Sequence, residues 1–161
     1  MSDSAAAKAY ELWKAVEGTE ESTGEWMEIT QDRINQFADV TEDHQFIHVD
    51  PEAAKATPFG TTIAHGFLTL SMLTHLDALT PNTAEPGRYD GITMGINYGF
   101  DKVRFPSPVP VGSKIRVHRM LSRVTLKGTS LETMRTMTVQ VEGSDRPAVV
   151  AEWVTRLMFS S

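Results

Sequence analysis

Asp43 and His48 stand five positions apart in a polar stretch of the chain, and Gly66 follows where an apolar run begins. A carboxylate and an imidazole held close together can share and move a proton near neutral pH. The run that opens at Gly66 has a helical pattern, and a backbone N–H at a helix N-terminus can hold a developing oxyanion. An acid, a base and an oxyanion site suit chemistry next to a carbonyl group, so Asp43, His48 and Gly66 are the predicted catalytic residues.

A metal site is the alternative use of the same stretch. His44 and His48 are four residues apart, and Asp50 follows them. Two histidines at this spacing share a metal ion only if one helix runs through both. Asp50 and Pro51 instead have the pattern of a new helix, with Asp50 as its N-cap and Pro51 in the first turn. We therefore expect no metal ion here.

The composition narrows the class of protein. A chain of 161 residues fits one domain with a single core. A net charge of −6 would repel nucleic acids and anionic membrane surfaces, so neither is an expected partner. The chain has no cysteine, no secretory signal pattern and no apolar run long enough to span a bilayer. These observations predict a soluble, cytoplasmic protein.

Two short helices are expected on either side of the catalytic stretch. Thr30 can cap a helix in which Ile34, Phe37 and Ala38 share one face, and Asp50 can cap the next one. The segment from Asp43 to His48 is then a loop between them.

The long apolar segment 65–79 predicts the central element of the fold. Its apolar residues cover most of a helical circumference, which is typical of a helix buried on nearly all sides. Its polar positions are mainly small, such as Thr74, which can line a cavity.

After this helix the period changes from helical to two. Ile92, Met94, Ile96, Tyr98 and Phe100 alternate with small or polar residues, as in a strand with one face on a core. The alternation slips near residues 101–102, which predicts a β-bulge. Three further strands are expected at 114–126, 130–141 and 147–159.

One buried helix followed by consecutive strands with short connections predicts an α+β fold, an antiparallel sheet curled around the helix. Residues 1–24 are expected to form a peripheral helix and a linker, and residues 25–161 the main domain. A sheet with free edges and an apolar layer favours pairing with a second copy, so we expect a homodimer.

The chain resembles the MaoC-like, (R)-specific enoyl-CoA hydratases of the hot-dog fold, including their nodulation protein N-like branch. The most specific stretches are 43–54, with Asp43 and His48 at their spacing, then Phe59-Gly60 and 63–68, which reads Ile-Ala-His-Gly-Phe-Leu. Segments 96–99 and 103–112 support it less specifically. The resemblance covers the chain from about Trp26 to Phe159.

The resemblance implies reversible syn hydration of a trans-2-enoyl-CoA to an (R)-3-hydroxyacyl-CoA, without a metal or redox cofactor. Asp43 and His48 would activate the water and handle its proton, and the Gly66 N–H would hold the thioester oxygen. Thr74 would stand near the catalytic carboxylate, where relatives carry a helix serine, and His65 would position the turn before Gly66. These residues, with Phe46, are expected around the substrate.

The family loop commonly reads Asp-x-Asn-Pro, whereas this chain has Gln45 and Phe46 in place of the last two residues. Phe46 is therefore expected to reshape the acyl channel. Two alternatives remain open: a hot-dog acyl-CoA thioesterase, which attacks the thioester carbonyl, and a non-catalytic module that only binds acyl thioesters.

Overall fold

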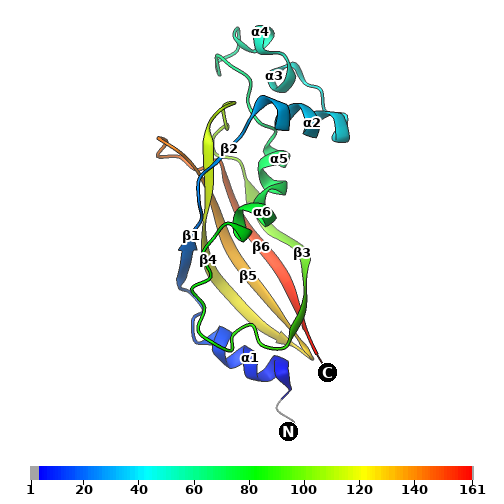
Figure 1. Ribbon diagram of the computed structural model, residues 1–161, viewed down its shortest axis with the longest axis vertical. Helices are drawn as coiled ribbons and strands as arrows, with labels where there is room; N and C mark the ends of the chain where they lie inside the picture. The colour runs from blue at the N-terminus through cyan, green and yellow to red at the C-terminus, as the bar shows by residue number, and fades with distance from the viewer. Residues whose placement is uncertain (1–3, 161) are drawn as a thin grey trace.

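An antiparallel sheet of six strands forms the body of the protein (Figure 1). The computed structural model describes residues 4–160. The strand order is β1-β4-β5-β6-β3, and β2 also pairs with β4. The strands are β1 (Glu20–Thr23), β2 (Met27–Glu28), β3 (Ile92–Arg104), β4 (Lys114–Lys127), β5 (Ser130–Val141) and β6 (Val149–Phe159).

The three C-terminal strands form where the alternation of the sequence predicts them. Along β5, buried residues alternate with half-buried ones almost without interruption, because every second side chain faces the core. In β4 the same phase holds as far as a register shift between Leu121 and Arg123. The predicted strands at 114–126, 130–141 and 147–159 are confirmed.

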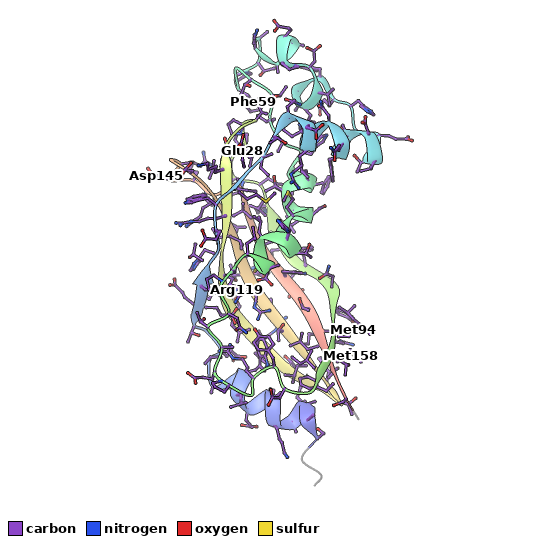
Figure 2. All side chains as sticks on the ribbon, viewed as in Figure 1. Glu28, Phe59, Met94, Arg119, Asp145 and Met158 are labelled. Carbon is purple, nitrogen blue, oxygen red and sulfur yellow. The ribbon has the colours of Figure 1, made fainter. Side chains whose placement is uncertain are left out.

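β3 confirms the predicted strand and bulge but corrects the predicted orientation. Its pairing with β6 shifts register between Phe100 and Lys102, as expected. Met94, Ile96 and Tyr98, predicted to face a core, are instead 55%, 41% and 61% exposed, and Met94 projects from the edge of the sheet in Figure 2. A period of two shows that one face of a strand is apolar, but it does not show whether the same chain covers that face.

The central helix is divided and only partly covered, which corrects two expectations. It consists of α5 (Gly66–Ser71) and α6 (Leu73–Ala78), separated at Met72. One stripe, which includes Leu68 and Leu76, packs into the main core against β4, β5 and β6. The opposite stripe is exposed and consists of Phe67, Ser71, Thr74 and Ala78.

Three helices lie beyond one end of the sheet (Figure 1). α2 (Gln31–Thr41) is capped by the Thr30 hydroxyl, and α4 (Pro51–Ala54) by the Asp50 carboxylate, as predicted. Between them, α3 (Phe46–Val49) replaces the second half of the expected loop. His48 therefore stands on a helical turn, and Asp43 precedes it in the remaining loop.

The N-terminal segment packs on the sheet at the other end. α1 (Ala5–Lys14) buries Trp13 completely in a second cluster of apolar residues. The linker expected after the helix within residues 1–24 is wrong in part, because Glu20–Thr23 is strand β1, paired with β4. The division of the chain at residue 24 stays a prediction. Among residues 4–160, no helix has both the length and the apolar character needed to cross a membrane.

Candidate active site

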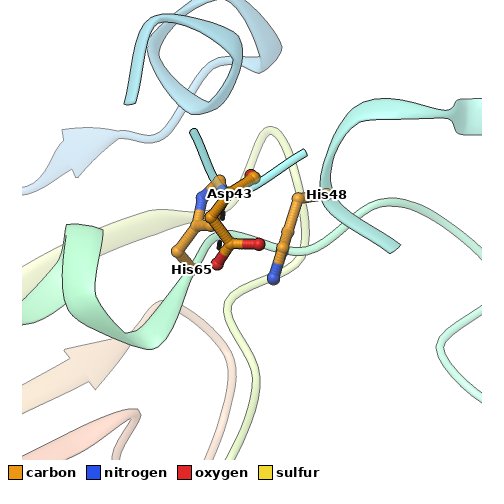
Figure 3. A group of neighbouring side chains, drawn as sticks. All are labelled: Asp43, His48 and His65. Carbon is orange, nitrogen blue, oxygen red and sulfur yellow. Dashed lines mark hydrogen bonds and ion pairs between the residues drawn. The ribbon is translucent and has the colours of Figure 1, made fainter. Parts of the chain in front are cut away.

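Asp43 follows the end of α2 and presents its carboxylate at the edge of the site (Figure 3). α2 ends at Thr41; the backbone of its C-cap residue Glu42 is left-handed with φ 61°, and this turn redirects the chain. The Asp43 side chain is half exposed. Its Oδ1 accepts only a long bond of 3.4 Å from the Gln45 N–H, so the carboxylate keeps lone pairs for a proton or a water molecule.

His48 is buried, and its tautomer follows from its partner. Its Nδ1 lies 2.7 Å from the carbonyl oxygen of Ile63. A carbonyl only accepts, so Nδ1 carries the proton and Nε2 keeps a free lone pair. Burial lowers the pKa of His48 below its ordinary value; the Ile63 hydrogen bond opposes this shift, neighbouring His65 adds to it, and Asp43 opposes it. A neutral imidazole with a free Nε2 can act as a base.

His65 contacts both predicted catalytic residues. Its Nε2 donates to the Asp43 backbone carbonyl at 2.9 Å and lies 4.0 Å from the Asp43 carboxylate. Its ring stacks on that of His48, with centroids 3.8 Å apart and an angle of 26° between the planes. His65 is 2% exposed, and its Nδ1 has no hydrogen-bond partner among the described residues. His65 thus fixes the positions of two side chains, beyond the turn-positioning role expected for it.

Gly66 begins α5, so its N–H has no acceptor within the helix. A β-carbon at this position would lie 3.1 Å from the ring of Phe105, closer than side chains normally pack. Glycine therefore leaves space for Phe105. It also has no side chain that could cover the first N–H of the helix.

A cavity of about 290 Å³ joins these elements. Its walls come from the turn before α5, from α5 and from segment 105–109, and include His48, Gly66, Thr69, Phe105, Ser107 and Ala148. His48 and Gly66 thus face one space. Asp43 is held next to it through His65.

Two residues expected around the substrate lie elsewhere. Phe46 is 47% exposed at the start of α3 and does not line this cavity. Thr74 is exposed on α6 and lines a separate cavity with Tyr98 and Trp153. The residue that sequence reasoning missed is Thr69, which is 2% exposed and lines the cavity with Gly66. Its spacing of three from Gly66 places both on one helix face, and this was the available signal.

The donor atoms of Asp43, His48 and His65 lie within 4.8 Å of one another, so a metal site must be considered. The in-plane lone pairs of two stacked imidazoles run side by side, however, and do not converge on one ion. His44 is not part of the group, because its Nε2 pairs with Asp39 at 2.9 Å on the surface. The arrangement suits proton transfer better than metal coordination.

Comparisons with known proteins agree with this geometry. The family described as MaoC like domain matches residues 14–143. This chain belongs to the MaoC-like family. The 3-hydroxyacyl-thioester dehydratase Z of Mycobacterium tuberculosis is 48% identical over 143 residues, covering 88% of this chain and 91% of that protein. Nodulation protein N of Rhizobium leguminosarum bv. viciae is also 48% identical, covering 88% of this chain and 86% of the relative.

The MaoC-like assignment extends to the architecture. R-Hydratase PhaJ1 from Pseudomonas aeruginosa superimposes with a TM-score of 0.66 at 22% identity, covering 92% of this chain and 86% of that one. The fold is therefore the α+β hot-dog fold expected from the sequence, with a divided central helix.

Proposed function

We propose that this MaoC-like protein is an (R)-specific enoyl-CoA hydratase that adds water reversibly to a trans-2-enoyl-CoA. One observation carries the proposal: His48, whose Nε2 is free, and Gly66, which supplies the first N–H of α5, line the same cavity, and the Asp43 carboxylate lies within 4.8 Å of the donor atoms of His48 and His65. The mycobacterial relative is named a 3-hydroxyacyl-thioester dehydratase, which describes the reverse reaction and supports this class.

The proposed reaction gives each of these groups a role. A water molecule between His48 Nε2 and the Asp43 carboxylate gives up a proton to the pair while its oxygen bonds to C3 of the enoyl group. The charge that develops on the thioester oxygen is held by the Gly66 N–H. The same pair returns a proton to C2 from the same face, which makes the addition syn. Dehydration reverses these steps.

The experiment that tests this function follows crotonyl-CoA. A hydratase removes the absorbance of the conjugated thioester, leaves the thioester bond intact and gives (R)-3-hydroxybutyryl-CoA. Release of free CoA with unchanged enoyl absorbance would assign the thioesterase reaction instead. Binding without any turnover would leave only a thioester-binding module.

We also infer that two copies pair through β3. β3 is an edge strand of 13 residues that pairs with β6 on one side only. Its exposed Met94, Ile96 and Tyr98 give this edge an apolar surface. The exposed stripe of α5 and α6, which includes Phe67, adds to it. A long, apolar edge that a second identical chain can extend supports a symmetric dimer.

A further inference from the structure

A second cavity lies between Trp26 and the β5–β6 hairpin. Its volume is about 470 Å³, larger than the 290 Å³ cavity beside His48. Arginine, aromatic, amide and hydroxyl side chains line it, among them Trp26, Arg116, Thr138, Gln140, Ser144 and Arg146. The proposed reaction uses none of these residues.

Arg116 is held rigidly on the wall of this cavity. Its Nε donates to the Gln140 side chain at 2.8 Å, and its guanidinium carbon lies 4.3 Å from the ring centroid of Trp26. Within residues 4–160, neither terminal nitrogen of Arg116 has a hydrogen bond or ion pair. A guanidinium fixed at one edge and stacked on an aromatic ring is preorganised to bind a phosphate with its remaining N–H groups.

Arg146 adds a second charge to the same wall. Its guanidinium is exposed and has no ion pair within the described part of the chain. Asp145 also lines the cavity, so the local balance is two positive charges against one negative charge. Five other arginines lie within 3.5 Å of a carboxylate: Arg88, Arg119, Arg123, Arg135 and Arg156. In a chain with a net charge of −6, two unpaired arginines in one cavity indicate an anionic ligand.

A short stretch of chain, Ser107 and the backbone of residues 146–148, lies between this cavity and the proposed active site; it is called the strip below. The Ser107 hydroxyl donates to the carbonyls of Arg146 at 3.3 Å and Pro147 at 2.8 Å. Ser107 and Ala148 line the cavity beside His48, whereas Arg146 and Pro147 line the arginine cavity. Figure 2 shows one lining residue of each, Asp145 and Phe59, toward the same end of the molecule.

We propose that the arginine cavity binds the phosphorylated nucleotide end of coenzyme A. The flexible pantetheine arm would cross the strip at Ser107 and Pro147, so that the thioester reaches Gly66. This inference rests on the proposed function and makes it more specific, because it assigns recognition of the carrier to Arg116 and Arg146. A thioester without the nucleotide would use the site at His48 but not the arginine cavity.

The test compares two thioesters with the same acyl group. Arg116→Gln and Arg146→Gln are assayed with crotonyl-CoA and with the crotonyl thioester of N-acetylcysteamine, which lacks the nucleotide. Each variant is expected to lose about 10-fold in kcat/KM for crotonyl-CoA, mainly through KM, since a bond to a charged group contributes to binding. Values for the truncated thioester are expected to stay those of the wild type. Arg116→Lys should keep part of the effect, because it retains the charge but not the fork of donors.

Lys127→Gln is the matched control. It removes one exposed positive charge at the β4–β5 hairpin, whereas Arg116 stands near the opposite end of β4. Its kinetics should match the wild type with both thioesters. Calorimetric titration of coenzyme A itself gives a readout that does not depend on turnover, and both arginine variants should weaken this binding.

The outcomes separate the two proposals. Unchanged kinetics and coenzyme A binding in both arginine variants would overturn the nucleotide site while leaving the hydratase in place. A parallel loss with both thioesters would also overturn it, since the arginines would then be supporting the structure in general. If the wild type binds coenzyme A through these arginines but hydrates neither thioester, the nucleotide site stands and the proposed reaction fails.

Discussion

The rings of His48 and His65 lie face to face, with centroids 3.8 Å apart, and each donates one N–H to a backbone carbonyl. Two stacked imidazoles in a buried site cannot both become charged at moderate cost, because each cation would repel the other. The stack therefore helps to keep His48 neutral. At the same time, His65 donates to the Asp43 backbone carbonyl, so one residue positions the predicted acid and adds to the effect of burial that lowers the pKa of the predicted base.

Two substitutions of His65 should separate these roles. His65→Phe loses both the donor to the Asp43 carbonyl and the charge that repels a protonated His48, so we expect kcat to fall and the acidic limb of kcat/KM to move to higher pH. His65→Gln keeps an amide donor and removes the stacked imidazole, so the acidic limb of kcat/KM should move to higher pH. If both variants only lost stability, with unchanged kinetics per folded molecule, His65 would have a structural role alone.

The lowered pKa of His48 predicts how activity depends on pH. In the proposed reaction the base works in its neutral form, so kcat/KM should stay level near pH 7 and fall only below the ordinary histidine value of about 6.5. The profile of kcat/KM for crotonyl-CoA between pH 5 and 8 checks this. An acidic limb centred well above the ordinary histidine value would contradict the assignment of His48 as a neutral base.

The same shift predicts a dependence of stability on pH. As the pH falls below about 6.5, the unfolded chain binds a proton at His48 before the folded one does, so the free energy of unfolding decreases until the pH passes the lower, folded-state pKa. Urea unfolding of wild type and His48→Asn at neutral and mildly acidic pH measures this contribution. The variant should show the shallower slope.

Replacing the carboxylate tests the other half of the pair. Asp43→Asn should lower kcat by about 10²–10⁴-fold, the usual contribution of a positioned acid or base. The fold should persist, because the side chain is half exposed and accepts one long hydrogen bond. Asp39→Asn is the matched control: the same change on exposed α2, in a pair with His44, should leave the rate unchanged. Equal rates in wild type and Asp43→Asn would remove this residue from the mechanism.

Gly66→Ala should reduce activity through Phe105. The added methyl group would lie 3.1 Å from the aromatic ring and push it from its place in the cavity wall. Overpacking of this kind costs about 1–3 kcal/mol, so the variant should still fold. The double variant Gly66→Ala with Phe105→Leu restores space and should recover part of kcat/KM. Failure of the second change to rescue any activity would argue against this contact as the cause.

The inferred dimer can be tested by charging its proposed edge. Ile96→Lys places a positive charge on the exposed apolar face of β3, and a lysine on an edge strand discourages pairing. Light scattering coupled to size-exclusion chromatography should give a dimer mass for the wild type and a monomer mass for the variant. Val40→Lys, at a position 80% exposed on α2, serves as the control and should stay dimeric. An unchanged mass for Ile96→Lys would place the interface elsewhere.

Much of the fold could be predicted because its signals are local. Asp50 followed by Pro51 specifies a helix start with its own cap, and the alternation in β5 specifies a strand independently of its neighbours. The spacing of Asp43 and His48 likewise pointed to one site. These features depend on a few adjacent residues, so the sequence shows them directly.

The features that could not be predicted depend on contacts between distant segments. His65 meets His48 only because the turn before α5 lies beneath α3, and no spacing within either segment encodes that stack. Thr74 was expected near the carboxylate, yet the helix carries it to another cavity and brings Thr69 to the site instead. The exposed face of β3 shows the same limit, because the alternation of residues shows that the face is apolar but not which segment, if any, covers it.

Glu21 is a further case, since a glutamate in a polar run gave no sign that it would be buried. Its carboxylate is 6% exposed and lies within 3.5 Å of three arginines, Arg88, Arg119 and Arg135. A shortened chain that began at residue 25 would keep every proposed catalytic group but leave Arg88 and Arg135 without their carboxylate partner, whereas Arg119 would keep its ion pair with Asp77 at 2.7 Å. Unpaired charges of this kind cost about 3–5 kcal/mol, a large part of what holds a domain of this size folded. Glu21 on β1 therefore stabilises the fold as a whole, and removing it would also destabilise the proposed catalytic site at the far end of the molecule.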